Sequence, residues 1–353
     1  MFKSVLAAIA ALSLATATHA QDQAPRPVTS YKAPRAADGH PSLEGVWTNA
    51  SITRLERNSR HGATLSLTET EVRKIEARNQ ALIDLGNRPT APNATVTDLP
   101  ADCSDGRGTD CNYNAAWTDP GSVVMRVGGQ GRNGFITSTP DGRVPMRPDL
   151  KPRPRNGGPS DHPESRALGE RCLLSFGTSS GPVMTPGLYN NTYQIVQTRD
   201  HVTIVVEMVH DARIIRIGGK HQTGAIRPWM GDSIGRWEGD TLVVETVGFH
   251  PQQVFRGASE HLKVTERFTP VSADRMHYGF WVEDPTVFRQ PWGGEYEFSR
   301  LNGMIYEYAC HEGNYGLANI LSGAREEERT GVKTAPTNID QVAPQGEEGG
   351  EEN

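Results

Sequence analysis

The stretch Leu262–Val282, LKVTERFTPVSADRMHYGFWV, decides the fold of this chain. Residues 262–269 and 276–282 each alternate apolar side chains with others, and a short polar segment separates them. A period of two residues is typical of a β-strand with one buried face, and two such runs joined by a short turn predict an antiparallel hairpin.

Similar runs flank this hairpin on both sides. They are residues 193–207, 213–217, 241–247, 295–300 and 304–311. Short turns join most of them and no helical pattern intervenes, so we expect an antiparallel meander that closes into a barrel to hide its edges. Gly45-Val46-Trp47 resembles the first-strand signature of lipocalin-type barrels, in which the Trp closes one end. The expected fold is therefore mainly β, a lipocalin- or calycin-like barrel with one N-terminal helix and long irregular loops.

The helix is predicted just before the loops. Thr68 and Glu71 have the spacing of a capping box, Leu67 and Val72 occupy the hydrophobic-staple positions, and Gly86 is a stop signal. We expect this helix to pack against the outside of a sheet. Residues 88–186 are rich in proline and glycine, which predicts long loops over the barrel mouth.

The two ends of the chain have their own signatures. Residues 1–20 combine a basic start, an apolar run and a small-x-small site near Ala20, which predicts a cleaved secretory signal peptide and a periplasmic protein. Residues 21–40 read as a flexible leader and 41–325 as a single barrel domain. Residues 326–353 are acidic with little apolar surface, and we expect a disordered tail.

The charge of the chain limits the kinds of molecule that it is expected to bind. The formal net charge is −6, with no basic cluster for nucleic acid and no cationic amphipathic helix for lipid. We therefore expect a small-molecule ligand, no nucleic acid and no membrane insertion. ATP and nicotinamide cofactors are cytoplasmic pools, so we expect an exported protein to work without a cofactor.

The four cysteines are even in number, as expected for disulfides in an oxidising compartment. Three connectivities are possible, and we favour Cys103–Cys111 and Cys172–Cys310. The alternatives are a zinc site or a catalytic thiol, but no Cys-x-x-Cys pair is present.

Two blocks of sequence resemble a group of secreted bacterial proteins that has no assigned activity. They are GDSIGRWEGDTLVVET at residues 231–246 and YEYACHEGNYG at residues 306–316. The resemblance covers about residues 165–325 and implies a periplasmic location and a bacterial source. It carries no residue roles with it.

One carboxylate is predicted to point into the barrel. Glu266 alternates with Val264 and Phe268, so it shares their inward face. A buried carboxylate needs a partner, and Arg267 points the other way, so the partner must come from another strand. The competing interpretation is a structural ion pair.

A second group of candidates lies at strand ends. Glu307 and His311 would share one face of the predicted 304–311 strand, where a carboxylate could orient an imidazole as a general base; both could instead face solvent. The catalytic candidates are His311 or His210 as base, Glu307 or Glu266 as acid or orienter, and Arg213 or Arg236 as anion stabiliser.

The candidate substrate-binding residues are aromatic or rim-facing. They are Trp229, Arg236, Trp237, Trp292, His221 and Tyr315. Flat apolar rings at a barrel mouth suit an aromatic or sugar ring. His210, His221 and His311 could converge on zinc, although no local spacing supports this, and we predict no metal.

Two classes of function remain open. The first is a cofactor-independent lyase or hydrolase that uses general acid–base catalysis on a small hydroxylated aromatic or sugar-like molecule, with a lyase favoured. The second is a lipocalin-like protein that binds a small molecule without catalysis. Cavity polarity separates them, because an enzyme needs converging titratable groups and a carrier needs a mainly apolar lumen.

Overall fold

A computed structural model describes residues 24–27, 29–86, 93, 121–150, 162–175, 181–187, 190–222, 224, 226–253 and 255–331. The strands are β1 Gly45–Thr48, β2 Ser66–Leu67, β3 Arg126–Val127, β4 Gln130–Arg132, β5 Thr192–Gln197, β6 His201–Val206, β7 Ala212–Ile217, β8 Asp232–Glu238, β9 Thr241–Val247, β10 Lys263–Pro270, β11 Arg275–Glu283 and β12 Trp292–Arg300. The α-helices are α1 Glu69–Gly86 and α2 Tyr315–Thr330.

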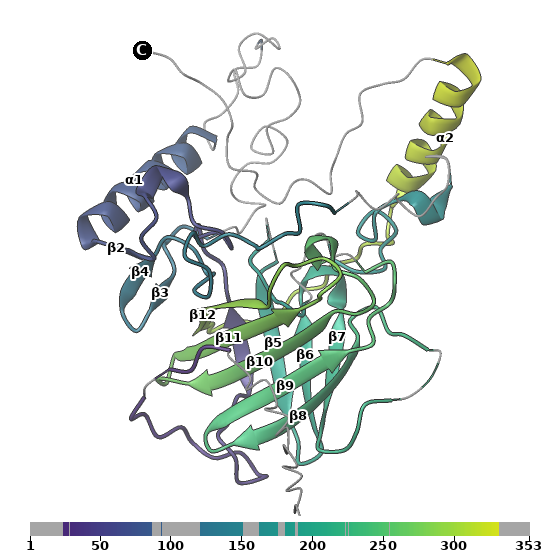
Figure 1. The fold of residues 1–353 in the computed structure, drawn as a ribbon. Coiled ribbons are helices and arrows are strands. Elements are labelled where there is room, and N and C mark those ends of the chain that lie inside the picture. Colours follow the sequence, from purple (N-terminus) through teal and green to yellow (C-terminus); the bar gives the residue numbers. More distant parts are fainter. Residues whose placement is uncertain are drawn as a thin grey trace, which may run out of the picture.

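The predicted barrel is confirmed. Among the described residues the strands close in the order β1-β12-β11-β10-β9-β8-β7-β6-β5, and β2, β4 and β3 form a separate small sheet (Figure 1). The hairpin predicted from residues 262–282 is β10 and β11, with Phe268 opposite Tyr278. Its inward side chains are fully buried, as the alternation requires.

Two details of the meander differ from the prediction. Strand β8 runs parallel to β7, because the connection 218–231 returns the chain to the starting end of β7 before β8 begins (Figure 1). Residues 304–311 form no strand. The place beside β12 is taken by β1, which pairs with both β12 and β5, so no free edge remains for residues 304–311.

One barrel end is closed around Trp47. This side chain is buried, donates its indole N–H to the Leu43 carbonyl at 2.9 Å, and lies 4.4 Å from the Arg300 guanidinium that covers its ring. Gly45 has φ 131°, and a Cβ there would lie 2.3 Å from Arg300 Nη1. The sequence Gly-x-Trp therefore combines a sharp bend with an end plug, as the lipocalin resemblance predicts.

The leader predicted to be flexible packs against the barrel where the structure describes it. Asp38 accepts hydrogen bonds from the Gln197 side chain, and His40 stacks on Trp237 with ring centroids 4.7 Å apart. Arg35 pairs with Asp240 at 2.9 Å. Residues 1–20, the predicted signal peptide, lie outside the described residues.

Helix α1 has the predicted capping box. Thr68 N–H donates to Glu71 Oε2 at 2.7 Å, and Glu71 N–H donates to Thr68 Oγ1 at 3.3 Å. The helix packs on the small sheet rather than on the barrel, with Val72 buried against Leu67 and Val124.

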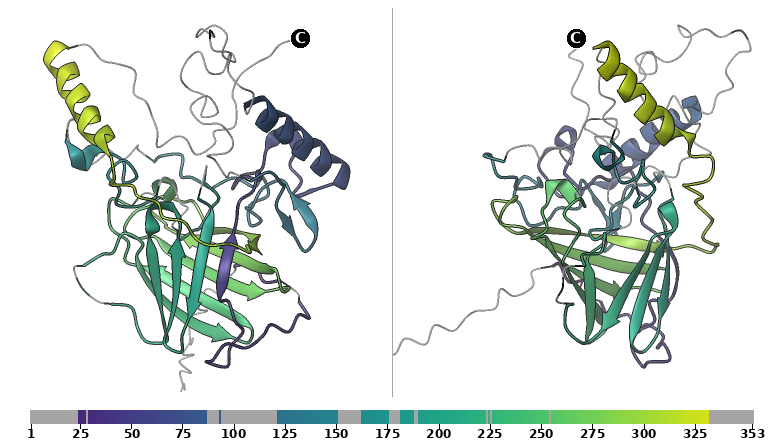
Figure 2. Two further views of the ribbon diagram at one scale, coloured as in Figure 1. Left: turned by 180° about the vertical axis from the view of Figure 1, so that it is seen from behind. Right: turned by 90° about the vertical axis from the view of Figure 1, so that its right-hand side faces the viewer.

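Helix α2 was not predicted. Asn314 caps its N-terminus by accepting from Leu317 N–H, and Gly331 ends it in a left-handed conformation. Its C-terminal end includes residues 326–330, so the prediction that the disordered tail begins at residue 326 is wrong for these five residues. Residues 332–353 lie outside the described part. Figures 1 and 2 show α1 and α2 on opposite sides of the same barrel end. No helix of the described residues is long and apolar enough to cross a membrane.

The long disulfide predicted from the sequence is present. Cys172 and Cys310 are bonded, with Cα atoms 5.7 Å apart. The bond fixes residues 162–175 beside the segment that leads into α2. Cys103 and Cys111 lie outside the described residues.

Candidate functional site

A buried ion pair crosses the barrel lumen. Arg213 on β7 and Glu266 on β10 form a two-pronged contact, and their side chains are 2% and 0% exposed. The two strands are not neighbours in the sheet, since β8 and β9 lie between them. Glu266 therefore points inward and finds its partner on another strand, as its alternation predicts.

Hydroxyl groups extend this pair along the lumen. Tyr278 Oη donates to Glu266 Oε1 at 2.8 Å, and Arg213 Nε donates to Ser233 Oγ at 3.3 Å. Ser233 Oγ in turn lies 2.8 Å from Thr246 Oγ1. All five residues are buried. The part of the lumen around them, called the upper lumen below, therefore holds a continuous polar network inside an aromatic and aliphatic core.

A short segment of the chain covers this network. The strap, residues 181–187, places the buried Met184 against two tyrosines. Met184 N–H donates to Tyr278 Oη at 3.2 Å, and Tyr296 Oη donates to the Met184 carbonyl at 2.6 Å. Asn49 Nδ2 donates to Tyr296 Oη and to Tyr193 Oη, each at 3.2 Å.

Burial controls the charge state of these tyrosines. Loss of solvent raises the pKa of Tyr278 well above 10, and the negative charge of Glu266 raises it further. Burial likewise raises the pKa of Tyr296 and of Tyr193. The three hydroxyls therefore stay protonated at neutral pH and act as hydrogen-bond donors and acceptors.

Phe135 packs against the mouth from another loop. Its carbonyl oxygen lies 2.1 Å from where a Cβ of Gly294 would stand, and its ring lies 5.1 Å from that of Tyr296. Only glycine permits this approach, because any side chain at this inward position of β12 would displace the loop. Of the predicted loop region 88–186, the described residues Phe135 and 181–186 thus pack over the lumen network.

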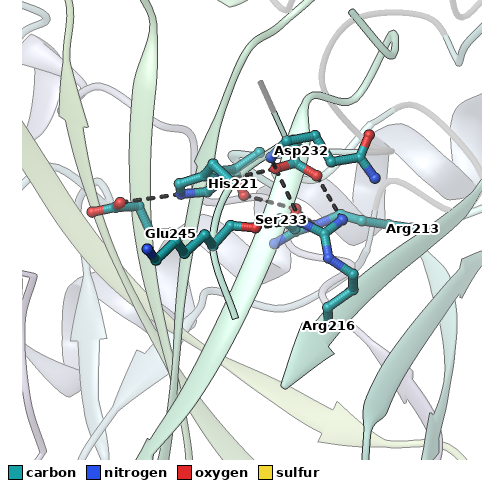
Figure 3. A network of polar contacts seen from close by, with 9 residues as sticks. Arg213, Arg216, His221, Asp232, Ser233 and Glu245 are labelled. Carbon is teal, nitrogen blue, oxygen red and sulfur yellow. Dashed lines mark hydrogen bonds and ion pairs between the residues drawn. The ribbon is translucent and has the colours of Figure 1, made fainter. Parts of the chain in front are cut away.

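His221 lies in a second network, outside the lumen. Figure 3 shows it between Asp232 and Glu245, with contacts of 2.9 Å from Nδ1 and 3.2 Å from Nε2. Arg216 pairs with Asp232 at 2.7 Å, and Lys263 pairs with Glu245 at 2.6 Å. Both ring nitrogens of His221 are engaged by carboxylates, so this residue anchors the 218–222 turn to β8 and β9.

The pKa of Asp232 reflects these partners. Partial burial alone would raise it, but hydrogen bonds from Arg216, Gln222 N–H and His221 outweigh that effect and hold the pKa at about 2. Asp232 is therefore an anion over the physiological range, and its role is to bind Arg216, His221 and the Gln222 amide.

The predicted catalytic residues fall into two groups that the structure does not bring together. Arg213 and Glu266 lie in the lumen. His210, Glu307 and His311 are exposed, and His210 Nδ1 lies 3.0 Å from the Tyr308 carbonyl. The pairing of Glu307 and His311 on one strand face was wrong, because residues 304–311 are not a strand.

Glu307 borders a groove on the outside of the barrel. The groove has a volume of about 500 Å³ and lies between residues 169–170, residues 307–310 and the first turns of α2. Leu317 and Ile320 form part of its apolar wall. His210 and His311 are not among its lining residues.

The predicted substrate-binding residues do not share one surface. Trp292 is fully buried among Phe255, Phe280 and Phe288. The other five are partly buried or exposed. Trp237 stacks on His40, and the ring centroids of Trp229 and His250 lie 3.9 Å apart. Arg236 donates to Glu238, His221 lies between two carboxylates, and Tyr315 is 77% exposed. The prediction that these side chains converge was wrong, because the number of aromatic residues does not determine which strand, or which face of it, each residue occupies.

The residues that sequence reasoning missed are Asn49, Tyr278, Tyr296, Ser233 and Thr246. The signal for Tyr278 was present, because it follows the alternation of 276–282 and falls opposite Phe268 in the predicted hairpin. The signal for Asn49 was absent, because it lies just beyond β1, outside any periodic run.

Among the described residues, no three His, Cys, Asp or Glu side chains are placed to hold a metal ion, so the three histidines considered for zinc do not converge. No protein-family model matches the chain, and no curated protein matches its sequence. The lumen is therefore the feature that bears on function.

Proposed function

We propose that the protein is a periplasmic small-molecule-binding barrel whose ligand site is the polar upper lumen around Arg213, Glu266, Tyr278 and Tyr296. The observation that carries this proposal is a mainly apolar lumen in which a few buried polar side chains from separate strands converge. Small-molecule sites combine mainly apolar walls with a few oriented polar groups, and barrel mouths are among their usual places.

The energetics of the ion pair support a role beyond folding. A buried ion pair loses much of its Coulomb energy to desolvation, and apolar residues of similar volume often stabilise a fold as well or better. The aromatic and aliphatic side chains around Arg213 and Glu266 would form a core without them. We therefore infer that Arg213 and Glu266 are retained because they hold hydrogen-bonding groups in fixed positions for a ligand.

Two observations support an exported protein. The Cys172–Cys310 bond suits an oxidising compartment, and residues 1–20 have the pattern of a secretory signal. The resemblance of two sequence blocks to secreted bacterial proteins is a third point in favour of a periplasmic location. Fractionation of the producing cell tests this part directly, and recovery of the intact chain with residues 1–20 in the cytoplasm would contradict it.

Calorimetric titration with a small panel tests the binding site. The panel is catechol, phenol, glucose and benzoate, and we expect a hydroxylated neutral ring to bind while benzoate does not. Tyr296→Phe should weaken that binding about fivefold, since one net hydrogen bond is worth about 1 kcal/mol. Tyr315→Phe, which removes an exposed hydroxyl, is the matched control. Absence of binding by all four probes would refute the proposal.

A lyase acting at the same place is the second candidate, and the Tyr278–Glu266 hydrogen bond favours it. In an elimination, Glu266 would take a proton from a carbon next to a carbonyl while Tyr278 gives its proton to the departing oxygen. The new carbon–carbon double bond and a released alcohol or water complete the balance. Proton transfer from Glu266 back to Tyr278 along the 2.8 Å contact would reset both groups.

Product analysis separates the two candidates. Incubation with 3-keto-glucosides, followed by NMR for an unsaturated product, should show turnover only if the lyase proposal holds. Tyr278→Phe should then abolish turnover while the variant still binds substrate. Binding without turnover would leave the carrier function and exclude the lyase for these substrates.

A further inference from the structure

We infer that the strap, residues 181–187, occupies the ligand's place, and that the ligand is a neutral ring bearing two adjacent hydroxyl groups. This inference rests on the proposed function and adds to it the chemistry of the ligand. Val183 and Met184 are buried among the lumen residues, and the Met184 backbone hydrogen-bonds to both tyrosine hydroxyls, those of Tyr278 and Tyr296.

The hydrogen-bond directions define what the tyrosines need. A phenol has one hydrogen to donate. Tyr278 gives its hydrogen to Glu266, so toward the strap it accepts, and Met184 N–H is the donor. Tyr296 accepts from Asn49 and therefore donates toward the strap, where the Met184 carbonyl accepts. A ligand in this place must bring one donor and one acceptor.

Asn49 adds a third requirement. Its Oδ1 atom is buried and has no hydrogen-bond partner among the described residues, while its Nδ2 serves Tyr193 and Tyr296. An unmet buried acceptor costs free energy, and the strap does not relieve it. A ligand hydroxyl that accepts from Tyr296 and donates to Asn49 Oδ1 would satisfy both residues with one oxygen.

The walls and the charge complete the ligand's description. Phe135, Phe280 and Phe298 surround the tyrosines with ring centroids 5.1–5.9 Å away, which suits a flat ring. Arg213 and Glu266 neutralise each other, so a charged ligand would enter a buried site without a counter-charge. A vicinal diol on a ring meets all three polar requirements and both of these limits.

Competition between ligand and strap gives the test. Calorimetric titration of the full chain uses catechol, phenol and benzoate as probes. We expect catechol to bind about tenfold tighter than phenol, because it reaches Asn49 as well, and benzoate not to bind. Asn49→Ala should reduce the catechol preference to near one.

Met184→Ala weakens the strap's hold and should tighten catechol binding at least tenfold, since a ligand that must displace a competitor binds with reduced apparent affinity. Met125→Ala removes the same kind of side chain from a buried position outside residues 181–187 and should leave the affinity unchanged. In the wild type, saturating catechol should accelerate hydrogen exchange at the Met184 amide, which checks displacement without any substitution.

The outcomes distinguish the inference from the function on which it rests. If the wild type binds catechol but Met184→Ala binds no tighter and the Met184 amide is not exposed, the strap is a fixed part of the wall and the inference fails. Equal affinity for phenol and catechol overturns the diol assignment. If neither the wild type nor Met184→Ala binds catechol, phenol, benzoate or glucose, the proposed function itself fails.

Discussion

Arg213 and Glu266 are the pair of charges most fully removed from water among the described ion pairs. Glu266→Gln would leave the Arg213 guanidinium buried without a counter-charge. Removing one partner of a buried pair costs about 3–5 kcal/mol, and urea unfolding followed by circular dichroism should show that loss. Asp149→Asn, in an exposed pair with Arg147, should leave the unfolding midpoint unchanged. A loss for Glu266→Gln below about 1 kcal/mol would show that the lumen admits water.

Asp232 should contribute to the stability of the fold in a way that is lost in acid. Its pKa is about 2 in the folded chain against an ordinary value of 3.8. A depressed pKa stabilises the folded state above pH 4, and the stabilisation is lost as the pH falls from 4 toward 2. Asp232→Asn should therefore unfold more easily than wild type at pH 5, and the difference should shrink toward pH 2. Urea titrations at both pH values measure it; a constant difference would contradict the assignment.

The sequence predicted that the Glu266 side chain points into the barrel, but it did not predict which residue pairs with it. Alternation along residues 262–269 places one side chain on one face, which is a local property. The meeting of Arg213 with Glu266 depends on the curvature of four strands from β7 to β10, and no short-range pattern encodes that. The hydroxyls of Tyr278 and Tyr296 were missed because tyrosine in a strand is ordinary by composition.

Among the elements, the Cys172–Cys310 bond ties two distant segments of the chain together. It joins residues 138 positions apart and holds the segment before α2 against residues 162–175. Replacing both cysteines by alanine should lower stability by about 2–4 kcal/mol, measured by chemical unfolding. The double variant should also be less sensitive to dithiothreitol than wild type. Equal stability of the two proteins would show that the packing around α2 is sufficient alone.

Local sequence patterns predicted a helix or strand correctly only where no other segment occupied the position that the element would take. The capping box at Thr68 located α1 correctly. Residues 304–311 alternate like a strand, yet β1 had already taken the only edge beside β12. Helix α2 was hidden because its acidic last turn resembles a tail, although Asn314 and Gly331 are ordinary start and stop signals.

For the whole molecule, closure depends on four residues of β1. A chain that begins at Pro41 keeps β1 and should fold as a monomer, with reduced stability because the contacts of Asp38 and His40 are lost. A chain that begins at Ser51 lacks β1 and exposes the edges of β12 and β5, so it should aggregate or remain unfolded. Size-exclusion chromatography and circular dichroism compare them. A soluble, cooperatively folded chain from Ser51 would contradict this account.

The general barrel architecture followed from the sequence because closure is a common solution for a long meander. The identity of the closing strand did not follow. Gly45–Thr48 is too short to show alternation, and its partners lie about 150 and 250 residues away, beyond any local signal.

The pairing of β1 with β12 has a consequence for biosynthesis. A ribosome releases Gly45–Thr48 long before Arg300, so the ring stays open until nearly the whole polypeptide has emerged. During that interval the nascent chain presents unpaired strand edges, which attract other chains. Holdase chaperones that bind extended segments should therefore associate with it until Arg300 arrives.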